Sequence, residues 1–182
     1  MDFNTVDVKE KLLQFLKAGF QKAGVRMNVL KSDPQTAAEL PCIGINRTAD
    51  SETVHSLGDF AGSDFDTDLL EYSEVYSAYY QESMEVRIWH TNADERERAY
   101  RLLKALLMVF RPVIVEQGVR SFTVEGGKDE SDFTGQVAPF PVYWASVVIS
   151  YLNPLDVQVG EMAEIITNIF VNGGVVVDTE EP

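Results

Sequence analysis

The chain has few of the residues from which catalytic, metal and disulfide sites are built. Cys42 is the only cysteine, so no disulfide can form within the chain, and we expect it to be a small buried hydrophobe. The only histidines, His55 and His90, are far apart, and no serine lies in a Gly-x-Ser-x-Gly motif. Gly126-Gly127 lacks the Gly-Lys-Ser/Thr continuation of a phosphate-binding loop. We therefore predict no catalytic residue, no cofactor and no enzyme activity; an enzyme of another type is an alternative.

Long hydrophobic runs are also missing. No apolar run approaches the roughly 18 residues of a membrane span, and the N-terminus is acidic, unlike a signal peptide. With 182 residues, 45% hydrophobic and 24% charged, the composition is typical of a soluble globular protein. We expect a single domain over residues 1–182 and no membrane partner.

Positive charge is scarce in one long window. The net charge is −14, and no Lys or Arg occurs between Arg47 and Arg87. Ten acids lie in that window: Asp50, Glu52, Asp59, Asp64, Asp66, Asp68, Glu71, Glu74, Glu82 and Glu85. Their charge serves solubility, or it forms a surface that repels a polyanion or binds a basic partner. Tight nucleic-acid binding is disfavoured because it needs clustered Lys and Arg.

One acidic segment, Asp64-Phe-Asp-Thr-Asp68, is similar to the start of a calcium loop. A calcium loop needs glycine at its sixth position and a bidentate acid at its twelfth. Those positions hold Leu69 and Val75, so we predict no metal site. The other carboxylates show no spacing that singles out a glycosidase pair.

Two helices are predicted from apolar spacing. The first spans residues 5–23 and is closed by Gly24. The second spans residues 93–111, with Asn92 as N-cap, and Pro112 ends or kinks it. Its apolar stripe consists of Ala99, Leu102, Leu103, Leu106, Leu107 and Phe110.

Strands are predicted around these helices at residues 25–31, 41–48, 72–80, 84–90, 119–125 and 139–151, with Asn153-Pro154 ending the last. Residues 49–68 and 126–137 are predicted as loops, the first an acidic insertion, and residues 154–182 as a C-terminal extension. Residues 162–177 fit a helix or strands, and Asn172-Gly173 favours strands. The fold class is α+β: a mainly antiparallel or mixed β-sheet packed by an N-terminal and a central helix.

The order of elements resembles the tail terminator (tail completion) proteins of tailed bacteriophages. The resemblance rests on the strand Glu85-Val-Arg-Ile-Trp-His, the helix start Asn92-Ala-Asp-Glu-Arg-Glu-Arg and the strand Phe140-Pro-Val-Tyr-Trp-Ala-Ser-Val-Val-Ile-Ser-Tyr. The order of elements is similar over residues 5–155, and the local sequence pattern is similar over residues 84–152. The insertion at 49–68 and the segment after Asn153 fall outside it.

That resemblance implies a structural virion protein of the tail and neck, assembled in the host cytoplasm. Its subunits would close into a homo-oligomeric ring, a hexamer, that caps the tail tube protein and joins the head connector or neck protein. DNA would pass through the ring without tight binding, and acidic channel walls favour such passage. The expected channel-facing acids are Asp64, Asp66, Asp68, Glu71 and Glu74.

Two alternatives remain open from the sequence. Within the same class, the chain is a head-closure or connector-adaptor protein, or a neck protein like the tail tube. In another class, it is an acidic inhibitor that mimics DNA, which the charge supports but the long apolar strand does not explain.

Overall fold

The computed structural model describes residues 2–53, 60–66, 71–132 and 137–159. The helices and strands follow in the order β1 (Asp2–Thr5), α1 (Val8–Lys22), β2 (Asn28–Leu30), η1 (Ala37–Glu39), β3 (Cys42–Thr53), β4 (Phe60–Asp66), β5 (Glu71–His90), α2 (Ala93–Val115), β6 (Arg120–Asp132) and β7 (Val142–Val159). The chain divides into two compact units, of which the larger comprises Val6–Thr53 and Tyr79–Asn153.

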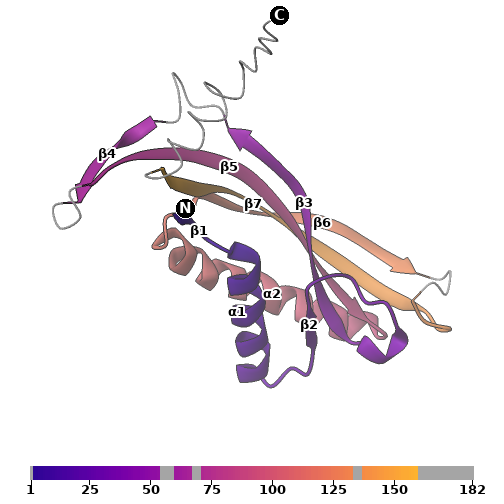
Figure 1. Ribbon diagram of the computed structural model, residues 1–182. Helices are drawn as coiled ribbons and strands as arrows, with labels where there is room; N and C mark the ends of the chain where they lie inside the picture. The colour runs from indigo at the N-terminus through magenta and orange to yellow at the C-terminus, as the bar shows by residue number, and fades with distance from the viewer. Residues whose placement is uncertain (1, 54–59, 67–70, 133–136, 160–182) are drawn as a thin grey trace, which may run out of the picture. The chain divides into compact units, whose positions relative to one another are not determined.

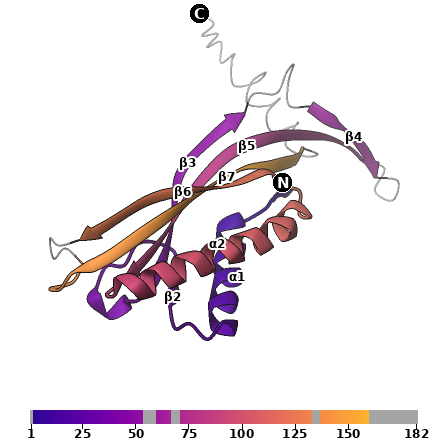
Figure 2. The same ribbon diagram turned by 180° about the vertical axis from the view of Figure 1, so that it is seen from behind.

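The larger unit is a single mixed sheet with two helices. Its strands lie in the order β6-β7-β5-β3-β2. β3 is antiparallel to β5, β6 is antiparallel to β7, and the edge strand β2 is parallel to β3. Figures 1 and 2 show α1 and α2 on the same face of this sheet. The predicted α+β architecture, with a mixed sheet packed by an N-terminal and a central helix, is confirmed.

Alternating residues of the strands build the core under the helices. Along a strand, successive side chains point to opposite faces, so every second residue can be apolar and buried. Seven such side chains are 0% exposed: Ile43, Ile45, Met84, Val86, Ile88, Val147 and Ile149. The helices cover them with Leu12, Leu16, Leu103 and Leu107, and Phe15 contacts Phe110 at 5.1 Å between ring centroids.

Helix α2 begins as predicted and continues further than predicted. The Asn92 side chain accepts hydrogen bonds from the backbone N–H of Asp94 at 2.9 Å and of Glu95 at 3.1 Å. Pro112 lies inside the helix, which continues to Val115. The proline removes the hydrogen bond to the carbonyl of Met108, whose residue is exposed to solvent, while Ile114 is buried in the core. Burial of Ile114 thus stabilises the last turn beyond the proline.

The prediction of two strands at residues 72–80 and 84–90 is wrong: both belong to β5. The residues between them carry Glu82, which is only 6% exposed. Its carboxylate accepts hydrogen bonds from Tyr151 and Asn153 on β7. These bonds hold the segment extended where the sequence offers no glycine, proline or asparagine for a turn.

The prediction of loops at residues 49–68 and 126–137 is also corrected. Ala49 to Thr53 belong to β3 and residues 60–66 form β4, while 54–59 and 67–70 lie outside the described residues. β6 continues to Asp132 through a bulge between Gly126 and Asp129. A Cβ at Gly127 would clash with Ser146 Oγ, so glycine permits the close contact of β6 with β7.

β7 does not end at Asn153-Pro154 but continues to Val159. In the smaller unit, its last residues pair with β1, starting at Leu155 opposite Thr5. The missing N–H of Pro154 is therefore not needed in that ladder. Also in the smaller unit, β4 pairs with the first part of β5. Residues 162–177, whose sequence fits a helix or strands, lie outside the described residues.

We expect Leu103→Ala to destabilise the larger unit. Leu103 is 0% exposed, and removing a buried leucine side chain typically costs about 2–5 kcal/mol because a cavity remains. The free energy of unfolding, measured in urea, is the readout, and Lys104→Ala on the exposed side of α2 is the control. Equal stability of the two variants would show that this helix face is not packed.

Candidate functional site

The face of the sheet turned away from α1 and α2 carries polar and aromatic side chains. They come from the strand positions that alternate with the core: Asn46 on β3, Glu85, Arg87 and Trp89 on β5, and Trp144 and Ser146 on β7. Because sheet neighbours lie about 5 Å apart, these side chains form one continuous cluster. This cluster joins residues of β3, β5 and β7 on one face of the larger unit.

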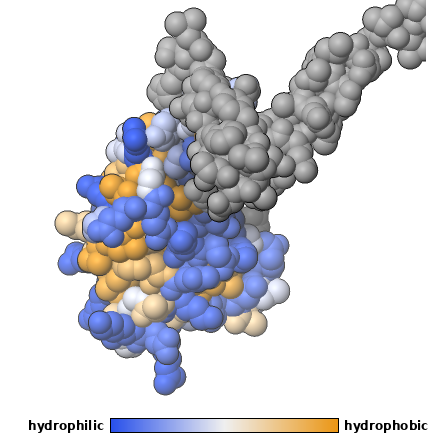
Figure 3. Space-filling model, turned by 60° about the vertical axis from the view of Figure 1, so that its left-hand side comes forward, coloured by the Kyte–Doolittle hydropathy of each residue, from blue (hydrophilic) through white to orange (hydrophobic). Residues whose placement is uncertain are grey.

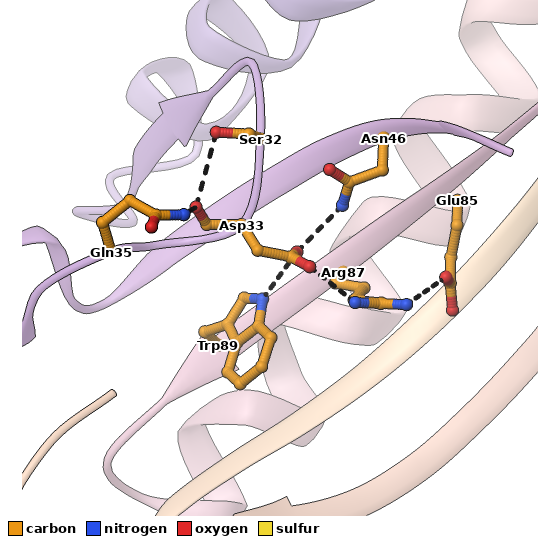
Figure 4. Close-up of polar contacts among 7 residues, drawn as sticks. All are labelled: Ser32, Asp33, Gln35, Asn46, Glu85, Arg87 and Trp89. Atoms are coloured by element: carbon orange, nitrogen blue, oxygen red, sulfur yellow. Dashed lines mark hydrogen bonds and ion pairs between the residues drawn. The ribbon is translucent and has the colours of Figure 1, made fainter. Parts of the chain in front are cut away.

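Asp33 is the centre of the cluster, and it comes from the segment between β2 and β3 (Figure 4). Its Oδ1 accepts hydrogen bonds from Asn46 Nδ2 at 2.9 Å and from Trp89 Nε1 at 3.2 Å. Its Oδ2 accepts one from Arg87 at 2.5 Å. Three donors on two strands therefore hold one carboxylate.

Arg87 bridges Asp33 to a second carboxylate, Glu85, at 2.6 Å. The guanidinium also lies 5.2 Å from the ring centroid of Trp144, which stacks on Trp89 at 5.6 Å. The hydrogen bond with Glu85 raises the pKa of Arg87. Burial works to raise the pKa of Glu85, but the hydrogen bonds from Arg87 and Ser146 outweigh it, and the pKa is lowered.

The segment that supplies Asp33 is itself fixed by local contacts. Glu39 accepts hydrogen bonds from the backbone N–H of Gln35 at 2.6 Å and of Thr36 at 3.0 Å, which caps η1. A Cβ at Gly44 would meet both Asp33 Oδ1 and the Ser32 carbonyl at 2.8 Å. Glycine at position 44 therefore lets the segment lie directly on β3.

The chemistry of this cluster is structural. Each carboxylate is already engaged by a cationic or neutral donor, and Ser146, at 0% exposure, accepts a hydrogen bond from the backbone N–H of Lys128. A nucleophile or a general base needs a free, activated group, which this arrangement does not provide. The cluster ties residues 32–40 to the sheet.

A second polar cluster lies on the helix side of the same strands. Both oxygens of Glu82 are used: Oε1 accepts from Asn153 at 2.8 Å, and Oε2 accepts from Tyr151 at 2.8 Å and pairs with Arg47 at 3.2 Å. Asn153 also donates to the carbonyl of Val6. Burial raises the pKa of the Tyr151 hydroxyl, so it remains a donor. This cluster joins the start of α1 to the sheet.

The acids predicted to face a channel lie mainly on two paired strands. Asp64 and Asp66 are on β4, Glu71 and Glu74 are on β5, and Asp68 lies outside the described residues. In the antiparallel register, Asp66 is opposite Glu71 and Ser63 is opposite Glu74. The strand conformation of Asp64–Asp66 differs from the turn that a calcium loop requires.

The cysteine and the histidines are the remaining candidate residues. Cys42 is 0% exposed beside Trp89 and Val142, and burial raises its pKa to about 12. His90 Nδ1 accepts a hydrogen bond from the backbone N–H of Asn92. His55 lies outside the described residues. Among the described residues, no group of three or more His, Cys, Asp or Glu can hold a metal ion.

Sequence reasoning missed both polar clusters. The only local signal was the charged alternation Glu85-Val-Arg87 within a β-pattern, which indicates that both faces of the strand have partners. The partners themselves, Asp33 and Asn153, are remote in sequence and carry no motif.

Comparison with protein-family models and with curated proteins finds no match to this chain. Among the described helices, neither α1 nor α2 is long and apolar enough to cross a membrane.

Asp33→Ala should lower the free energy of unfolding by about 1–3 kcal/mol, because it leaves the donors of Arg87, Trp89 and Asn46 without their acceptor. The exposed neighbour Ser32→Ala should change stability by less than about 0.5 kcal/mol. Urea denaturation of both variants tests this. A loss of stability in both would indicate that the loop backbone, and not the carboxylate, is responsible.

The free energy of unfolding should decrease at acid pH, in part because Glu85 becomes protonated. Its pKa is lower in the folded state, so its contribution is complete above the pKa of the unfolded chain. That contribution is lost as the pH falls through the folded value. Glu85→Gln should therefore flatten the dependence of unfolding free energy on pH below about 4.5, whereas Glu125→Gln, an exposed residue on β6, should not. A parallel acid loss in Glu85→Gln and the unmodified protein would contradict this role.

Proposed function

We propose that this chain is the subunit of a ring that caps the tail tube of a tailed bacteriophage and joins it to the head connector. The fold carries the proposal: two helices lie on one face of a single mixed sheet, in the element order that the resemblance to tail terminator proteins implies. The polar clusters support it further, since their charged groups are used within the subunit. Such a chain serves as a rigid building block.

In the proposed ring, the acidic residues of β4 and β5 would let DNA pass without binding. β4 and the first part of β5 place Asp64, Asp66, Glu71 and Glu74 in one antiparallel pair. Acids on a channel wall repel the phosphate backbone and prevent it from replacing its counterions with protein cations. This pair of strands is the part of the chain that we assign to the channel.

A closed ring requires two different surfaces on each subunit that meet head to tail. In the described part of the larger unit, β2 and β6 are the edge strands of the sheet, and α2 has an exposed apolar face. The proposed partners are further copies of the chain, six in a hexamer, the tail tube protein and the head connector or neck protein. The ring would lie in the neck of the virion.

The decisive experiment is to measure the mass of the purified chain by light scattering and to image it by electron microscopy. We expect rings, or monomers that form rings when tail tubes are added. Particles produced without this chain should have tails that are uncapped and not joined to heads. If particles produced without this chain have capped tails that are not joined to heads, the chain belongs to head closure instead.

Charge reversal tests the channel. Asp64→Lys with Glu71→Lys should leave the larger unit folded, because neither residue belongs to it. The double variant should retain DNA at low salt, and the slope of log affinity against log salt should steepen by about 2, one for each new cation. The matched control is Glu125→Lys with Glu130→Lys on β6. Equal DNA retention by the two double variants would place Asp64 and Glu71 outside the channel.

A further inference from the structure

Helix α2 has a second apolar face, which is exposed. Leu103, Leu107, Phe110 and Ile114 are buried against the sheet, at 0–1% exposure. On other sides of the helix, Met108 is 73% exposed, Val109 59%, Val115 47% and Val113 42%. We call these four residues the outer α2 face. Exposed apolar side chains gathered on one half of a helix are typical of a contact with another protein segment. Hydrophobic patches lie among hydrophilic ones on the described surface that Figure 3 shows.

Basic side chains flank the outer α2 face. Arg101, Lys104 and Arg111 are exposed along the same half of the helix. Arg101 is paired with Glu97 at 3.0 Å, and Lys104 lies over the ring of Tyr100. Two acids lie beside them: Glu97, which pairs with Arg101, and Glu116, directly after the helix. The surface therefore suits an apolar segment that carries negative charge.

The C-terminal part of this chain has that chemistry. Residues 160–182 contain Met162, Ile165, Ile166, Ile169 and Phe170, spaced at i, i+3, i+4, i+7 and i+8. Of the two conformations that the sequence leaves open here, a helix would gather these apolar side chains on one side. The same residues hold no Lys or Arg and five acids: Glu161, Glu164, Asp178, Glu180 and Glu181. Apolar pattern and charge both complement the outer α2 face.

We propose that the outer α2 face binds the C-terminal segment, residues 161–170, of a neighbouring copy. This inference rests on the proposed ring, because the contact joins two different surfaces and can continue around a ring. Pairing of two α2 faces is disfavoured, since it would bring Arg101, Lys104 and Arg111 of both copies together. Like charges across an interface oppose association.

The contact can be tested with two full-length variants that each add one cysteine, Met108→Cys and Ile166→Cys. The native Cys42 is 0% exposed, with a pKa of about 12, so it does not compete for oxidation. The two variants are mixed and oxidised with diamide, and covalent dimers are separated by non-reducing electrophoresis. Lys17→Cys, exposed on α1, replaces Met108→Cys in the control mixture.

We expect a dimer that contains one copy of each variant, in the test mixture and not in the control mixture. A dimer from Met108→Cys alone would instead show that two α2 faces meet. In a further sample, the double variant Met108→Cys/Ile166→Cys, a cross-link only within one chain would show that each copy covers its own helix. Either result, or no cross-link at all, overturns the proposal.

A second measurement separates this contact from the ring itself. Val109→Asp should shift the assembly toward smaller species in light scattering, and more so at low salt, because it adds a buried acid at the contact. Ala18→Asp on the exposed side of α1 is the matched control. Rings that form unchanged with Val109→Asp would refute the α2 contact and leave the ring standing. Unmodified protein that never forms rings would refute the proposed function, while the cross-link still reports on the contact.

Discussion

The fold depends on the burial of alternate side chains of β5 beneath the two helices. Met84, Val86 and Ile88 are 0% exposed, and the residues between them face the other side of the sheet. A shift of one residue in the register would exchange the two sets and bury Glu85 and Arg87 under α2. That penalty fixes the pairing of β5 with β3, from Cys42 opposite Trp89 to Thr53 opposite Tyr79.

The same alternation gathers polar side chains of the larger unit on the other face of the sheet, where Asp33, Arg87 and Glu85 are partners of one another. Once the register is fixed, Arg87 lies between Asp33 and Glu85, and charged groups in such partly buried positions need partners. The partners neutralise one another and attach residues 32–40 to the sheet. The binding surfaces that we propose lie elsewhere, at the strand edges, on the outer side of α2 and on the acidic strands β4 and β5.

The sequence predicted the helices well because their signals are local. Asn92, the apolar stripe after it and Gly24, with a positive φ of 72°, act within a few residues. The lengths of β5, β6 and β7 were underestimated because residues distant in the sequence determine them. Hydrogen bonds from Tyr151 and Asn153 keep the backbone at Glu82 extended. The close contact of Gly127 with Ser146 lets β6 continue along β7. The Asp33–Arg87 pair joins residues that are 54 positions apart in the chain, so no local sequence pattern predicts it.

Charge is unequally divided between the helices and the rest of the chain, and this division favours head-to-tail contacts. α1 and α2 contain nine of the fifteen basic residues but four of the 29 acids. A two-fold dimer through the helices would bring like charges together, whereas contact between a helix of one copy and an acidic segment of the next is attractive. In the ring that we propose, this attraction would repeat around the axis, and the acids that it leaves uncovered would repel DNA.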